Sequence, residues 1–82
     1  MANSNKLNVT ITKVDGPLFS GEAEFLTVPG VEGEMTVLAK HEAFISPLKS
    51  GTITVKTTEE TKEFVIESGT IEVSQNQATV IL

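Results

Sequence analysis

The chain has 82 residues, no cysteine, eleven acidic and six basic side chains, and a net charge of −5. This balance excludes a nucleic-acid reader, which needs clustered Lys and Arg against phosphates, and it disfavours an anionic membrane surface. Since no apolar run approaches the roughly 18 residues of a transmembrane helix and the first residues lack a signal-peptide pattern, we expect a soluble, cytosolic protein that does not insert into a membrane.

In chain order, the first half predicts short strands separated by turns. Residues 7–12 alternate between apolar and polar side chains, which is typical of a half-buried strand. Asp15-Gly16-Pro17 predicts a turn. A short extended piece is expected at 18–20, and a longer strand at 22–28. Phe25 and Leu26 are adjacent within 22–28, which indicates a bulge or a strand covered on both faces.

A further strand is expected at 33–38, with Met35 and Val37 on its inward face. Residues 43–45 are too few to assign, and Pro47 limits any strand there to an edge. The second half predicts strands at 52–57, 63–67, 70–74 and 78–82, with a polar hairpin tip at 58–62 and a turn at 75–77.

Strands recur about every ten residues and no window has a helical period, so the sequence predicts one all-β domain over residues 1–82. The expected fold is a flattened antiparallel β-sandwich or barrel of about ten short strands. The side chains expected to face inward are Val9, Ile11, Phe25, Val28, Ile53, Val55, Phe64, Ile66, Ile71 and Val73.

The segment 29–41 gathers two glycines, a proline, two carboxylates and the chain's single histidine, His41. Glu32 and Glu34 lie two residues apart, so both can project to the same side; they form either a solvated face or a carboxylate pair suited to a basic partner. A metal site is disfavoured because one imidazole with carboxylates offers too few nitrogen or sulfur ligands. His41 is expected to bond a backbone carbonyl or to take part in a binding surface.

Catalytic equipment is not evident in the sequence. No serine lies in the G-x-S-x-G context of a nucleophile. A phosphate loop is also missing, because no Lys-Ser or Lys-Thr pair and no predicted helix directly follows Gly30 or Gly33. We therefore expect no enzyme activity and no cofactor.

Several dissimilar positions at fixed spacing resemble the amino-terminal domain of the epsilon subunit of F-type ATP synthases. The most specific are Phe19-Ser-Gly21, Val28-Pro-Gly-x-Glu-Gly-Glu34, Leu38, His41, Pro47-Leu48 and Gly51; Phe64, Ser68-Gly69 and 71–73 add support. The resemblance extends from Leu7 to Leu82.

This resemblance implies a non-catalytic rotor subunit of the central stalk. Such a subunit links the gamma subunit to the membrane c-ring and couples proton transport to ATP synthesis, as a peripheral protein on the cytoplasmic side of the plasma (inner) membrane. It places Glu32, Gly33, Glu34 and His41 on loops that face the ring. The alternative that stays open is a small β-sandwich module that binds a peptide or small ligand.

Three departures from the family pattern concern the turn before His41 and the end of the chain. Thr36 stands where the family usually has Gly, and Ala39-Lys40 stands where it has Pro-Gly. We therefore expect an altered turn, with the Lys40 charge close to Glu34. The family's carboxy-terminal helical hairpin has no counterpart within these 82 residues, so its inhibitory role is not assigned to them.

Overall fold

The computed structural model describes residues 6–40 and 42–82, and these residues form nine strands and no helix. The bounds are β1 Leu7–Lys13, β2 Gly16–Ala23, β3 Phe25–Gly30, β4 Gly33–Leu38, β5 Phe44–Leu48, β6 Gly51–Lys56, β7 Thr61–Ile66, β8 Gly69–Ser74 and β9 Gln77–Ile81. The all-β prediction is confirmed. Since the described residues form no helix, none of them provides a membrane-spanning one.

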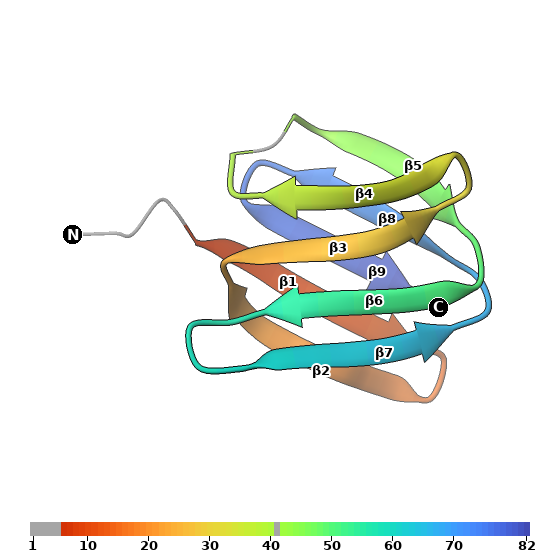
Figure 1. The fold of residues 1–82 in the computed structure, drawn as a ribbon, viewed down its shortest axis with the longest axis horizontal. Coiled ribbons are helices and arrows are strands. Elements are labelled where there is room, and N and C mark those ends of the chain that lie inside the picture. The colour runs from red at the N-terminus through yellow and green to blue at the C-terminus, as the bar shows by residue number, and fades with distance from the viewer. Residues whose placement is uncertain (1–5, 41) are drawn as a thin grey trace.

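The strands lie in two layers, with β4, β3, β6 and β7 in one layer and β2, β1, β9, β8 and β5 in the other (Figure 1). The layers are joined where β3 meets β5, through the single residue pair Gly30–Leu48. The nine strands therefore form one continuous sheet that curls over itself, which is the expected flattened sandwich.

One strand pair departs from the antiparallel expectation. β1 and β9 run parallel, in register from Asn8–Gln77 to Thr12–Ile81. The β8–β9 hairpin turns the chain back so that β9 points in the same direction as β1. Alternating side chains reveal a strand but not the direction of a neighbour that is distant in the sequence, so periodicity alone could not predict this pair.

The core lies between the layers and consists of aliphatic side chains. Of the side chains predicted to face inward, Val9, Ile11, Val28, Ile53, Val55, Ile66, Ile71 and Val73 are buried. Phe64 is half-buried against this core and contacts Phe19 edge to face, with ring centroids 6.3 Å apart. The remaining prediction, Phe25, is wrong.

Phe25 lies on the outer face because the predicted strand 22–28 is two strands. β2 ends at Ala23, the chain bends at Glu24, and β3 begins at Phe25 in the other layer. The Glu24 N–H donates to the carbonyl of Lys56 at 2.6 Å, which attaches the bend to β6. Leu26, fully buried, and Val28 then face the core. The adjacent Phe25 and Leu26 thus mark the crossing between layers, where the inward parity changes.

Candidate partner-binding surface

The β3–β4 hairpin carries Glu32, Gly33 and Glu34, three of the four residues that the sequence assigns to a binding surface. Val31 and Glu32 form a two-residue turn closed by the pair Gly30–Gly33, and the strands then pair without a break up to Phe25–Leu38. Because the turn is short and the register regular, the side chains at its tip are held in a defined direction.

Both glycines that close this turn are required by its geometry. Gly33 has a φ of +139°, in the region that glycine adopts readily and other residues rarely. At Gly30, an added Cβ would lie 2.7 Å from the carbonyl oxygen of Gly33 and 2.9 Å from Cε of Met35. A side chain at either position would therefore strain or displace the hairpin.

The hairpin is also attached to the opposite layer. The Val31 N–H donates to the Pro47 carbonyl at 3.3 Å, and the Lys49 N–H donates to the Pro29 carbonyl at 2.9 Å. A surface hollow of about 400 Å³ lies along this junction, lined by the hairpin together with Ser46 and Pro47. These bonds connect the tip to β5 and make it part of the rigid sandwich.

The tip is acidic and solvent-facing. Glu32 and Glu34 are both exposed. Neither forms an ion pair in the described part of the chain, where the salt bridge joins Lys62 Nζ to Glu60 Oε2 at 3.5 Å near the β6–β7 turn. Their carboxylates are thus available to a basic partner.

Lys40 does not lie close to Glu34, so that expectation is wrong. β4 has six residues and rises about 3.3 Å per residue, so the Cα atoms at its two ends lie roughly 16 Å apart. Lys40 lies beyond the far end, where its N–H donates to Asn76 Oδ1 at 2.7 Å in the β8–β9 turn. Because the turns before and after a strand lie at its opposite ends, the predicted strand at 33–38 already separates these two residues (Figure 1).

That the turn after β4 differs from the turn of the family stays a prediction. Lys40 has a φ of 68°, an uncommon left-handed conformation for a lysine, at the position where the family has glycine. His41 itself lies outside the described residues. Its neighbours Lys40 and Glu42 follow the far end of β4, so this turn and the Glu32–Glu34 tip do not form one cluster.

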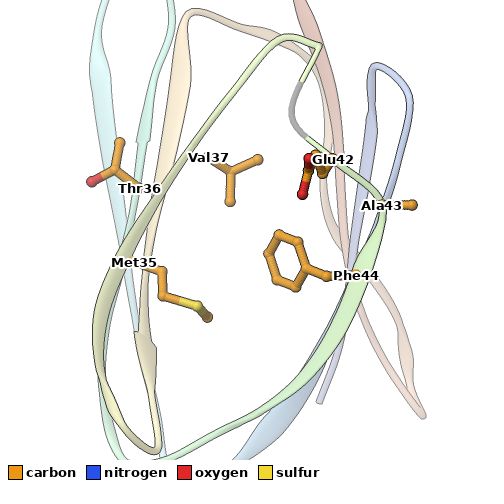
Figure 2. Close-up of a pocket in the computed structure, with 6 residues that line it drawn as sticks. All are labelled: Met35, Thr36, Val37, Glu42, Ala43 and Phe44. Carbon is orange, nitrogen blue, oxygen red and sulfur yellow. The ribbon is translucent and has the colours of Figure 1, made fainter.

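A groove between β4 and β5 was not predicted from the sequence. It has a volume of about 440 Å³ and is lined by Met35, Thr36, Val37, Glu42, Ala43 and Phe44. Figure 2 shows Met35 and Val37 of β4 and Phe44 of β5 pointing into it, while Thr36 and Ala43 point away. Met35 and Val37 were correctly expected to face the core. The neighbourhood of β4 and β5 could not be inferred, because these strands do not pair with each other.

Residues Lys6–Leu82 match the family model described as "ATP synthase, Delta/Epsilon chain, beta-sandwich domain". An "ATP synthase epsilon chain 1" of Methylococcus capsulatus is 38% identical over 76 residues, which cover 92% of this chain and 54% of that protein. The "ATP synthase epsilon chain" of Caulobacter vibrioides is 37% identical over 76 residues, 93% of this chain and 88% of that protein.

The fold also matches a chain in the cryo-EM structure of the mitochondrial ATP synthase of Euglena gracilis. The TM-score is 0.87 at 24% identity, covering 99% of this chain and 52% of the other. A chain in the central stalk and c-ring structure of the mitochondrial ATP synthase of Tetrahymena thermophila matches with a TM-score of 0.77 at 19% identity. The match covers 98% of this chain and 65% of the other. At these identities the likeness establishes the fold alone. The chain spans about half the length of the Methylococcus and Euglena proteins.

Proposed function

Because the chain belongs to the β-sandwich domain family of the ATP synthase delta/epsilon chain, a non-catalytic subunit, we propose that it is a central-stalk component of an F-type ATP synthase. In this role it links the gamma subunit to the c-ring and transmits rotation, so that proton transport is coupled to ATP synthesis. It is peripheral, on the cytoplasmic side of the membrane, and is held there by the ring.

The observation that carries this proposal is the acidic hairpin tip on a stiff support. Glu32 and Glu34 are exposed on a two-residue turn that is closed by Gly30 and Gly33 and whose backbone bonds to the opposite layer. Carboxylates held in this way complement basic and polar loops. Each exposed pair contributes only about 0.2–1 kcal/mol, so the tip mainly sets orientation and encounter rate.

Within the sequence-predicted set, we assign the ring contact to Glu32, Gly33 and Glu34. Lys40 is at the other end of β4, so the end of the hairpin that it follows is remote from this tip.

The test is Glu34→Lys, with Glu72→Lys on the exposed outer face of β8 as the matched charge reversal. The free energy of unfolding of both variants should lie within about 0.5 kcal/mol of the parent value, because both side chains are exposed. Glu34→Lys should reduce retention on purified c-ring and proton-driven ATP synthesis in reconstituted vesicles, and Glu72→Lys should reduce neither.

Two outcomes count against the proposal in different ways. If the parent chain does not bind purified gamma subunit, the assignment to the stalk fails. If gamma binding is normal but Glu34→Lys leaves ring retention and ATP synthesis unchanged, only the ring-facing assignment of the tip is wrong.

A further inference from the structure

The four strands at the margins of the two layers differ in how well their open edges are protected. β2 carries Pro17 and a register shift against β1, β7 carries the charged Lys62 and Glu63, and β5 contains Pro47. Proline, lysine and bulges are the usual means of preventing another strand from adding to an edge. β4 has no proline, lysine or bulge; its one charged residue, Glu34, lies at the turn end, and its pairing with β3 is regular throughout.

The backbone groups on the open edge of β4 follow from the register. Pro29 has no N–H, so its pair with Glu34 is not one of the doubly hydrogen-bonded pairs of the β3–β4 ladder. Such pairs alternate along antiparallel strands, so the pairs that contain Thr36 and Leu38 are of the same kind. The N–H and C=O groups of Glu34, Thr36 and Leu38 therefore point away from β3. None of them takes part in the loop and turn backbone bonds among residues 6–40 and 42–82.

The groove described above lies where a strand added to β4 would place its inward side chains. Met35 and Val37 alternate with the residues whose backbone is open, and Phe44 faces them from β5 (Figure 2). Met35 and Phe44 are only half-buried. An added strand would thus gain backbone hydrogen bonds and cover apolar surface at the same time.

The charge around β4 indicates the kind of strand that fits. Glu34 is on the strand and Glu32 precedes it, so this end of the edge is acidic. A second copy of the chain is disfavoured, because each copy carries a net charge of −5 and the two would repel. A basic residue on the incoming strand beside Glu34 would be attracted.

We propose that β4 is a strand-addition site for an extended segment of another protein, with apolar side chains facing the groove and a Lys or Arg beside Glu34. This inference goes beyond the stalk assignment and does not depend on the ring contact. Both proposals use the Glu34 side chain, but the ring proposal rests on the side chains at the hairpin tip, whereas strand addition rests on the open backbone edge of β4.

The test uses a fluorescein-labelled peptide of about seven residues in which Val alternates with Thr between terminal lysines. Fluorescence anisotropy should detect its binding to the chain. Thr36→Pro removes an outward N–H while leaving the β3–β4 ladder intact, and it should weaken binding by about tenfold. A peptide methylated at alternate amides should also bind at least several-fold more weakly, because it cannot form the ladder.

Glu63→Pro on β7 is the matched control. The backbone groups of Thr27 point away from β4 and towards β6, so the pair Thr27–Thr54 is hydrogen-bonded. The N–H and C=O groups of Thr54 therefore face β3, and its pair with Glu63 on β7 is not hydrogen-bonded. The Glu63 N–H thus also faces an open edge, that of β7. This variant should bind the peptide like the parent. If Thr36→Pro does not fold, amide hydrogen exchange of the parent chain replaces it: the peptide should slow exchange at Glu34, Thr36 and Leu38.

The proposal is overturned if the parent shows no binding at about 1 mM peptide, if the N-methylated peptide binds equally well, or if protection falls on β7 or β2 instead. Formation of a dimer protected along β4, measured by sedimentation and exchange without peptide, would assign the edge to a second copy and would also overturn it.

Discussion

Replacement of Gly30 by alanine tests whether close packing behind the hairpin holds the acidic tip in place. The added Cβ would lie 2.7 Å from a backbone oxygen of Gly33 and 2.9 Å from Met35 Cε. The methionine end can move, but the carbonyl moves only with the turn. Overpacking of this kind costs about 1–3 kcal/mol, offset by about 0.4–1 kcal/mol from the stiffer unfolded chain. We expect a net loss of about 1–2 kcal/mol.

Urea unfolding followed by circular dichroism measures this loss, and a thermal scan should show a midpoint lowered by about 5–15 °C for a domain of this size. Gly21→Ala is the control: its Cβ would lie 3.6 Å from the Phe19 ring, an ordinary contact, so this variant should keep the unfolded-state gain of about 0.4–1 kcal/mol and be at least as stable as the parent. If the two variants are equally stable, the turn relaxes without cost and the argument for a rigid tip is refuted.

Two further predictions concern the register of β3 and the turn that follows β4. Leu26→Ala should lower the free energy of unfolding by about 2–5 kcal/mol because it empties a fully buried site. Phe25→Ala should lower it clearly less, because Phe25 lies on the outer face. Equal losses in urea unfolding would contradict the assignment of Leu26 to the inward face of β3. Lys40→Gly should stabilise the chain by about 0.5–1 kcal/mol, because the left-handed backbone is strained for lysine; a lower thermal midpoint in this variant would show that the strain is absent.

The sequence by itself determined the fold class, most strand positions and the direction of most core side chains. Val9 and Ile11, or Ile71 and Val73, alternate with polar residues, and a period of two leaves one choice of buried face. Gly33 likewise lies in a turn and has a φ of +139°, a conformation that glycine adopts readily. These features are local, because burial and turn geometry act on residues that are neighbours in the chain.

Only the tertiary structure decided which strands lie beside one another. The parallel β1–β9 pair, the crossing between layers at Glu24, and the groove between Met35 and Phe44 all depend on how the sheet curls. A strand's pattern shows which face is buried but not what covers that face, because many arrangements of strands bury the same side chains. Backbone pairing between distant segments selects one of them, and with it the open edge of β4.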